Sequence, residues 1–171
     1  ARWTNEEIKK LSPWATTGKT PDRKQNVLTS LALDAAVHEA LNHRLIEKYK
    51  KMEDNEVRFE NYRTEDAEHV IVAYGSMARV CENTIDLARE QGIKLGLLRP
   101  ITLFPFPTKE IQRLVPQLQT MMSVELSAGQ MIEDIRLAVN GKIPVNFYGR
   151  LGGIVPSPQE VLEAFKNEIN K

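Results

Sequence analysis

Cysteine is almost absent from this sequence, since Cys81 is the only one among 171 residues. One cysteine excludes an internal disulfide, and it excludes an iron–sulfur cluster held by four thiolates of this chain alone. Long apolar runs are also missing, because none approaches the ~20 residues that a membrane-spanning helix requires. The first residues, Ala1-Arg2-Trp3, do not begin an apolar signal segment. We therefore expect a reducing, cytoplasmic location and no membrane partner.

The chain also lacks an excess of charge of either sign. It has 23 Lys and Arg residues against 23 Asp and Glu residues. A balanced chain has no net field that would attract a nucleic acid, so no nucleic-acid partner is expected. Its hydrophobic fraction of 42% and its charged fraction of 27% are ordinary for a soluble globular protein. The length falls within the usual size of one domain.

Residues 1–56 show no alternation of strands and helices, and we predict an N-terminal loop followed by a long amphipathic helical arm. Thr4 and Glu7 have the spacing of a capping box that opens a short helix. Residues 12–24 contain two prolines and one glycine and are predicted to form an irregular loop. The arm that follows has an apolar stripe at helical spacing, made up of Val37, Leu41, Leu45, Tyr49 and Met52. Its opposite face is charged, so we expect the stripe to pack on the next domain or on a partner chain.

Residues 57–171 alternate between strand and helix patterns, which predicts a second, α/β domain. The expected strands are residues 57–61, 69–74, 95–98, 121–126 and 145–148. Helical spacing fills the segments between the later strands, and Pro116 is expected to end or kink its helix. Ser157 and Glu160 have the spacing of a capping box for the last helix. This alternation predicts a three-layer fold, with a mostly parallel five-stranded sheet between two layers of helices.

Polar and small residues follow the predicted strands at the edge where parallel strands end. Ligands and partners of open α/β sheets bind at this edge. The candidate site residues there are Gly75, Ser76, Arg99, Glu125, Gln130 and Arg150. Two arginines and the N-termini of helices can hold an anion, or the same groups can dock a neighbouring domain. Docking is the favoured interpretation, because dedicated small-molecule pockets are few per protein.

No pattern typical of a catalytic or metal site is found in the sequence. Gly75-Ser76 lacks the glycine spacing of a nucleotide-binding fingerprint. His38 and His43 are five residues apart and do not share a helix face as paired metal ligands would. Cys81 lies on the apolar stripe of its helix, which favours a buried thiol over a nucleophile. We therefore expect no catalytic residue, no metal site and no cofactor held by this chain.

Four segments carry more specific motifs. They are VAYGSMAR (72–79), GLLRPITLFPFP (96–107), VELSAGQMIEDIR (124–136) and FYGRLGG (147–153). In this order they resemble signatures of the α subunits of 2-oxoacid:ferredoxin oxidoreductases, with the 2-oxoisovalerate and 2-oxoglutarate types most similar. The run from Leu98 to Pro107 is the most specific part. The family commonly has Asn two places after the glutamate, where this chain has Ser127, and this departure weakens the case for a polar network around Glu125.

The resemblance implies a fold, an activity and partners. The fold is that of the transketolase C-terminal domain, a mixed five-stranded sheet whose first strand, here 57–61, is an antiparallel edge strand. The activity, which belongs to the holoenzyme, is oxidative decarboxylation of a 2-oxoacid to an acyl-CoA with reduction of ferredoxin. Thiamine diphosphate, Mg²⁺, iron–sulfur clusters and coenzyme A are implied for the holoenzyme. The implied partners are a pyrimidine-binding domain of the same subunit and the other subunits (β, γ or δ), so this segment would have a structural, assembling role.

Two other interpretations remain open. The first is the corresponding domain of a transketolase or of a pyruvate dehydrogenase β chain, which shares the expected fold. The second is a free-standing module that binds an anion or a nucleotide at the same edge of the sheet. Saturable binding of coenzyme A or a nucleotide to the chain alone would favour the second interpretation.

Overall fold

The computed structural model describes residues 4–11, 21, 24, 27 and 29–169. Most of the loop predicted for residues 12–24 lies outside these ranges. Two compact units are present, Ala1–Arg44 and Leu45–Lys171. The predicted division after residue 56 stays a prediction.

Both predicted N-terminal helices are present. Helix α1 (Asn5–Leu11) begins with the predicted capping box, in which the Glu7 amide donates to Oγ1 of Thr4 at 3.3 Å and the Thr4 amide donates to Oε2 of Glu7 at 2.8 Å. Helix α2 (Ala35–Asn55) begins after Asp34, whose Oδ1 atom accepts the Val37 amide at 2.9 Å. Within the part of the chain that the structure describes, no residue of α2 is buried. Its apolar stripe is therefore exposed or half-buried.

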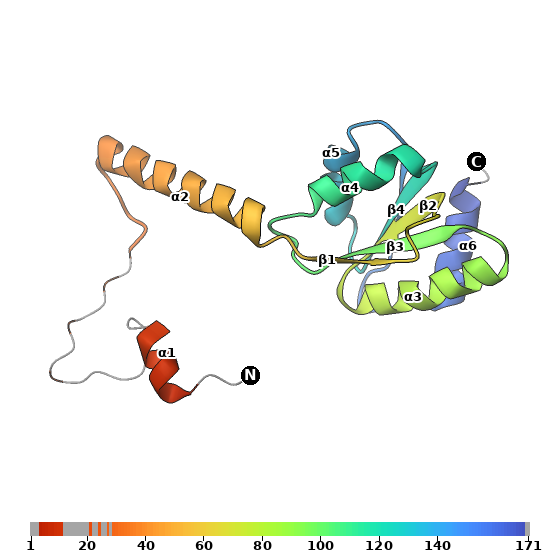
Figure 1. Cartoon of the computed structure of the whole chain (residues 1–171), viewed down its shortest axis with the longest axis horizontal. Helices are drawn as coiled ribbons and strands as arrows, with labels where there is room; N and C mark the ends of the chain where they lie inside the picture. The colour runs from red at the N-terminus through yellow and green to blue at the C-terminus, as the bar shows by residue number, and fades with distance from the viewer. Residues whose placement is uncertain (1–3, 12–20, 22–23, 25–26, 28, 170–171) are drawn as a thin grey trace. The chain divides into compact units, whose positions relative to one another are not determined.

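The five-stranded sheet has the order β1-β3-β2-β4-β5 (Figure 1). Its strands are β1 (Phe59–Tyr62), β2 (His69–Val72), β3 (Leu95–Pro100), β4 (Thr120–Glu125) and β5 (Val145–Gly149). The strands β3, β2, β4 and β5 are parallel, and β1 pairs antiparallel with β3. This confirms the predicted fold class, including the antiparallel edge strand.

Helices cover both faces of the sheet (Figure 1). One layer contains α3 (Gly75–Glu90) and α6 (Pro158–Ile169), which pack on each other. The other contains α4 (Thr108–Leu114), the 3₁₀ turn η1 (Val115–Gln117) and α5 (Met131–Val139). The α-helical part of this segment ends just before Pro116, as predicted, because proline cannot donate the next helical hydrogen bond.

Two hydrophobic clusters result, one on each face of the sheet. Successive side chains of a strand point to opposite faces. Val70 and Val72 of β2 accordingly belong to the cluster under α4 and α5, and Ile71 belongs to the cluster under α3 and α6. Cys81 is fully buried in the second cluster, and burial raises the pKa of its thiol to about 12. The prediction that Cys81 is a buried thiol is confirmed.

Candidate functional site

The carboxyl ends of β2, β4 and β5 lie side by side, because β4 pairs in parallel with both other strands. We call eight of the exposed or half-exposed residues that follow these ends the carboxyl edge. They are Gly75, Ser76, Leu126, Gln130, Arg150, Leu151, Ile154 and Val155. Four of them are aliphatic and well exposed, with fractions of 43% for Leu126, 60% for Leu151, 52% for Ile154 and 56% for Val155. The edge is thus an apolar surface with a few polar groups.

Glu125 ends β4 beneath this edge and is only 2% exposed. Its Oε2 atom accepts hydrogen bonds from the backbone amides of Gln130 at 2.9 Å and Met131 at 3.0 Å. Its Oε1 atom accepts the Ile132 amide at 2.9 Å. The first amides of a helix have no partner within the helix and favour a negative charge. Glu125 therefore supplies the anion at the N-terminus of α5 from within the chain.

Two serines complete the network around this carboxylate. Oγ of Ser123 donates to Oε1 at 2.7 Å and Oγ of Ser127 donates to Oε2 at 2.9 Å. The expectation that Ser127 weakens such a network was wrong, because a serine hydroxyl this close reaches the carboxylate as a donor. Burial alone would raise the pKa of Glu125, but its hydrogen bonds to the Gln130 amide, Ser123, the Met131 amide and Ser127 together lower that pKa below its ordinary value. Glu125 is therefore a buried, ionised carboxylate.

Arg150 follows β5 and joins this arrangement through its backbone. Its amide donates to the carbonyl oxygen of Glu125 at 3.1 Å. Its side chain lies 3.3 Å from Oε1 of Glu160. Glu160 in turn accepts the Ser157 amide at 2.8 Å, which confirms the predicted capping box of α6. Arg150 therefore connects the end of β5 to both β4 and the start of α6.

Arg99 is located differently from the sequence prediction. It was expected in the turn after its strand, but β3 continues to Pro100 and Arg99 pairs with Glu60 of β1. The strand continues because β1 extends the ladder. The Arg99 guanidinium also forms an ion pair with the Glu60 carboxylate at 2.9 Å. Arg99 thus faces β1, and the structure records no bond from it to the other candidates.

Gly75 and Ser76 open α3 directly after β2. Gly75 has a φ of +58°, a left-handed conformation that favours glycine. Tyr74, which precedes the helix, offers no side-chain hydrogen bond to its first amides. Ser76 is exposed. The edge therefore has one helix start capped by a buried carboxylate, at α5, and one without a side-chain cap, at α3.

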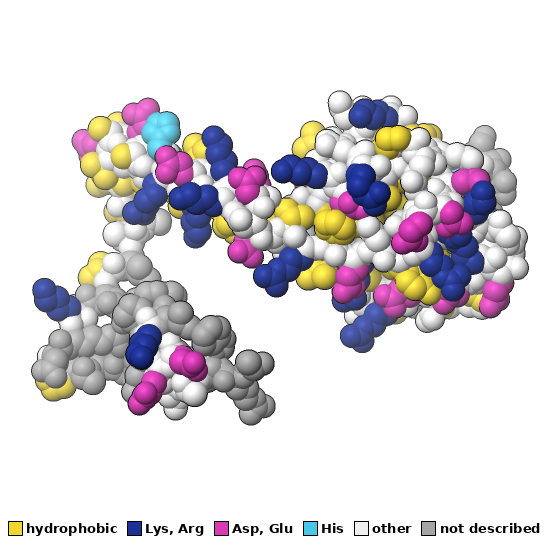
Figure 2. All heavy atoms as spheres, viewed as in Figure 1, with side chains coloured by type: hydrophobic (Ala, Val, Ile, Leu, Met, Phe, Trp, Pro, Cys, Tyr) yellow, Lys and Arg dark blue, Asp and Glu magenta, His cyan; other side chains and the backbone are white. Residues whose placement is uncertain are grey.

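A second apolar surface, missed from the sequence, surrounds Phe104 in the loop after β3. Phe104 is 57% exposed, and its ring meets that of Tyr49 edge-on at 5.7 Å between centroids. Ile101 and Leu103 beside it are 51% and 46% exposed. Figure 2 shows hydrophobic side chains gathered on the α/β unit where α2 ends. The proline-rich segment after β3 forms a turn, as predicted, and several of its apolar side chains are exposed.

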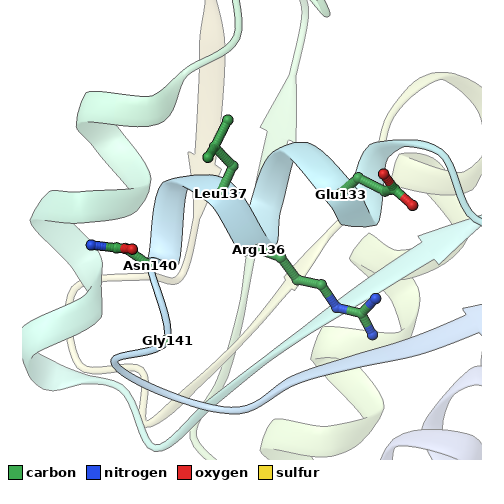
Figure 3. Close-up of a pocket in the computed structure, with 5 residues that line it drawn as sticks. All are labelled: Glu133, Arg136, Leu137, Asn140 and Gly141. Atoms are coloured by element: carbon green, nitrogen blue, oxygen red, sulfur yellow. The ribbon is translucent and has the colours of Figure 1, made fainter.

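An open depression lies along α5 (Figure 3). It is lined by Glu133, Arg136, Leu137, Asn140 and Gly141. All five belong to α5 or to the turn after it, and Arg136 and Leu137 leave the helix in opposite directions in the view. Their polar groups do not converge on one point, so we do not assign a ligand-binding site to this depression.

The described residues contain neither a cluster of metal ligands nor a helix that could span a membrane. No group of three or more His, Cys, Asp or Glu side chains lies close enough to hold a metal ion. None of the described helices is long and apolar enough to cross a membrane.

Comparison with protein families gives a match over more than half of the chain. The model of pyruvate:ferredoxin oxidoreductase core domain II matches residues 67–161. Those residues contain strands β2 to β5 and the whole carboxyl edge.

Curated relatives extend the match in sequence. The ketoisovalerate oxidoreductase subunit VorB of Methanothermobacter marburgensis is 46% identical over 153 residues, which are 90% of this chain and 43% of that protein. The 2-oxoglutarate synthase subunit KorA of the same organism is 29% identical over 125 residues, which are 73% of this chain and 33% of that protein. The chain spans less than half the length of these relatives.

Two solved structures share the fold. A 2-oxoglutarate:ferredoxin oxidoreductase from Magnetococcus marinus, with 2-oxoglutarate, coenzyme A and succinyl-CoA bound, has a TM-score of 0.69 at 22% identity, covering 81% of this chain and 24% of that one. A split-gene transketolase, in an inactive β4 tetramer, has a TM-score of 0.56 at 15% identity, covering 66% of this chain and 41% of that one. At these identities the likeness shows the fold alone.

Proposed function

Because the chain belongs to the pyruvate:ferredoxin oxidoreductase core domain II family, we propose that it is the transketolase C-terminal-like domain of a 2-oxoacid:ferredoxin oxidoreductase α subunit. One observation carries the proposal. The identity to a ketoisovalerate oxidoreductase subunit is 46% along 90% of the chain, against 29% along 73% for a 2-oxoglutarate synthase subunit. This difference favours 2-oxoisovalerate, a branched 2-oxoacid, as the substrate of the holoenzyme.

The role proposed for this chain is to assemble the enzyme and brace its neighbours. The holoenzyme would decarboxylate the 2-oxoacid oxidatively to an acyl-CoA and pass the electrons to ferredoxin. The family resemblance implies that thiamine diphosphate, Mg²⁺ and the iron–sulfur clusters would be held by other domains and subunits. The single cysteine of this chain is too few for a four-thiolate cluster. Cytoplasmic location remains part of this proposal.

The carboxyl edge is the proposed docking surface for the pyrimidine-binding domain and the other subunits. Its support is the exposure of four aliphatic side chains beside Gln130 and Arg150. Interfaces of proteins combine such apolar area with a few polar groups at the rim. Gly75 and Ser76 belong to the same surface, and Glu125 lies beneath it.

The geometry gives less support to a free-standing module that binds anions. The N-terminus of α5 is already occupied by the Glu125 carboxylate. The guanidinium of Arg99 lies against Glu60 and that of Arg150 against Glu160. A free anion at any of these three places would have to displace an internal carboxylate, whereas the start of α3 has no side-chain cap. Isothermal titration of the chain with coenzyme A tests this alternative, and saturable binding would support it.

Co-expression tests the main proposal. The complete subunit that contains this chain would be co-expressed with its partner subunits and assayed for coenzyme A-dependent ferredoxin reduction. We expect 2-oxoisovalerate to be used with a higher kcat/KM than 2-oxoglutarate or pyruvate. Arg150→Ala is expected to weaken assembly, measured by analytical ultracentrifugation, without unfolding the chain. Normal assembly with full activity in Arg150→Ala would contradict the role given to this residue.

A further inference from the structure

Asn140 and Gly141 form an exposed turn at the end of α5 (Figure 3). Asn140 caps the helix in a left-handed conformation, with a φ of 51° and a ψ of 44°. Gly141 follows with a φ of +72°. No other asparagine of the sequence precedes a glycine. The fold therefore places the one Asn-Gly pair of this chain at its surface, outside regular secondary structure.

The groups of this pair that can react with each other are not held by hydrogen bonds. An asparagine side chain is modified when the backbone nitrogen of the next residue attacks its Cγ atom. Among the residues that the structure describes, none accepts a hydrogen bond from the Gly141 amide and none bonds to the Asn140 side chain. Gly141 has no Cβ atom to shield its nitrogen, and the space where one would lie is open. Both the nucleophile and its target are thus accessible.

The attack requires rotation of the chain between these two residues, because Cγ and the Gly141 nitrogen must come within bonding distance. Two hydrogen bonds hold the turn. The Asn140 amide donates to the Arg136 carbonyl oxygen at 2.9 Å, and the Lys142 amide donates to the Val139 carbonyl oxygen at 3.3 Å. Only the second and longer bond lies beyond the rotating peptide. An exposed turn held in this way opens at little cost, and glycine adopts the new conformation easily.

From this geometry we infer that Asn140 is a site of spontaneous deamidation. The Gly141 nitrogen loses its proton to solvent and bonds to Cγ of Asn140, and the bond from Cγ to Nδ2 breaks to release ammonia. Water then opens the resulting succinimide ring. Cleavage at Cγ gives aspartate, and cleavage at the backbone carbonyl carbon gives isoaspartate. One water is consumed and one ammonia released, and nothing is oxidised or reduced.

Either product changes the end of α5. The new carboxylate lies at the C-terminus of the helix, where the helix dipole disfavours negative charge. Isoaspartate also adds one carbon atom to the main chain between α5 and β5. The site lies before the amino end of β5, whereas the carboxyl edge lies beyond its other end. The inference goes beyond the proposed function and does not depend on it.

The test uses the complete subunit assembled with its partner subunits, incubated at mildly alkaline pH and then mapped by peptide mass spectrometry. Asn55 and Asn83 are internal controls, because both are exposed and lie in helices. The nitrogen after Asn55 is held by the bond from the Glu56 amide to the Met52 carbonyl oxygen at 2.8 Å. We expect Asn140 to react at least about tenfold faster than either control, since neither is followed by glycine. Isoaspartate should appear beside aspartate.

The same subunit unfolded in guanidinium chloride separates the effect of the fold from that of the sequence. The native rate at Asn140 should lie within about tenfold of the unfolded rate. A native rate more than about tenfold below it would mean that the fold protects the pair, and would overturn the inference. A native rate no higher than that of Asn55 and Asn83 would do the same.

The products test the route of the reaction. Aspartate without isoaspartate would contradict attack by the Gly141 nitrogen, because only the succinimide gives both products. Asn140→Gln keeps the amide group but would have to close a larger and less favourable ring. Isoaspartate should therefore be lost from this position in the variant. If the intact variant still forms as much isoaspartate as the unchanged subunit, the reaction lies at another residue and the assignment to Asn140 is wrong.

Discussion

Nδ1 of His69 lies 2.9 Å from Oγ1 of Thr120, which pairs with it across β2 and β4 at the amino ends of the strands. The imidazole is 9% exposed and meets the Phe165 ring edge-on at 5.3 Å between centroids. Burial lowers the pKa of His69 below its ordinary value of 6.5, and the nearby Glu68 carboxylate opposes this only in part. The folded state therefore favours the neutral ring.

A pH dependence of stability follows from this lowered pKa. Above pH 6.5 the ring is neutral in both states and contributes its full stabilisation. As the pH falls below 6.5 the unfolded chain binds a proton that the folded chain does not, so the free energy of unfolding decreases. The decrease levels off below the pKa of the folded state. Urea unfolding between pH 7.5 and about 5 would measure it, a range in which carboxylates titrate little.

His69→Phe is the matched variant for this experiment. It removes the titrating group, so the decrease between pH 6.5 and pH 5 should become smaller. Glu110 and Glu125 have pKa values lowered from 4.5, and their stabilisation is lost only as the pH falls below that value. An unchanged pH profile in His69→Phe would contradict the assignment.

Removing the Glu125 carboxylate should destabilise the chain strongly. One buried donor left without a partner costs about 1–3 kcal/mol, and Glu125→Ala leaves several. We expect the free energy of unfolding to fall by at least about 3 kcal/mol, measured by urea denaturation. Glu133→Ala is the control, because Glu133 is an exposed carboxylate in the first turn of the same helix. Its effect should stay within about 0.5 kcal/mol.

Gly149 is expected to tolerate a side chain poorly. A Cβ atom there would lie 2.5 Å from Cζ of Phe147 and 2.5 Å from the carbonyl oxygen of Ser127. Gly149→Ala should therefore cost about 1–3 kcal/mol, as overpacking does, and should speed hydrogen exchange at the Arg150 amide. Gly141→Ala, at a position with open space, should leave exchange at Arg150 unchanged. An equal rate of hydrogen exchange at the Arg150 amide in both variants would contradict this prediction and show that β5 accommodates the methyl group without moving its end.

Cys81 should be unreactive in the folded chain. Burial raises the pKa of its thiol to about 12, so almost no thiolate is present at pH 8. Ellman's reagent is expected to modify no thiol in native protein and one thiol per chain in urea. Rapid labelling under native conditions would mean that the layer of α3 and α6 opens easily.

Ser157 should contribute the capping energy of the last helix. Its hydroxyl accepts the Glu160 amide at 3.3 Å, and its amide donates to Glu160 in return. Ser157→Ala is expected to cost about 1 kcal/mol in thermal or urea unfolding. Ser76→Ala, at the exposed start of α3, should change stability by less than about 0.5 kcal/mol. A similar loss in both variants would argue against a specific cap at Ser157.

Much of the fold could be predicted because local patterns and tertiary structure agree. The apolar run at 69–74 fits a strand buried on both faces. The helix cap at Ser157 could be predicted from the spacing of Ser157 and Glu160 alone. The antiparallel direction of β1 was implied by the family resemblance. The true length of β3 could not be predicted, because Arg99-Pro100 is typical of a turn and is held in the strand by pairing with β1, distant in sequence.

The candidate site was predicted in part, for the same reason. Parallel strands bring their ends together, so the positions of Gly75, Glu125 and Arg150 at one edge followed from the strand pattern. The hydrogen-bond donors to Glu125 could not be predicted, because Ser123 is a single polar residue in an otherwise apolar strand pattern. Only the three-dimensional turn after β4 shows that Ser123 and the amides of α5 meet at one carboxylate.

The antiparallel strand β1 also sets an order of events during folding. Among the strands that the structure describes, it pairs with β3 alone, which lies beyond β2 and the whole of α3 in the chain. Closing that long loop costs entropy before any β1 contact is gained. The strand is therefore expected to join the sheet late, and it should be among the first parts to detach when the domain opens.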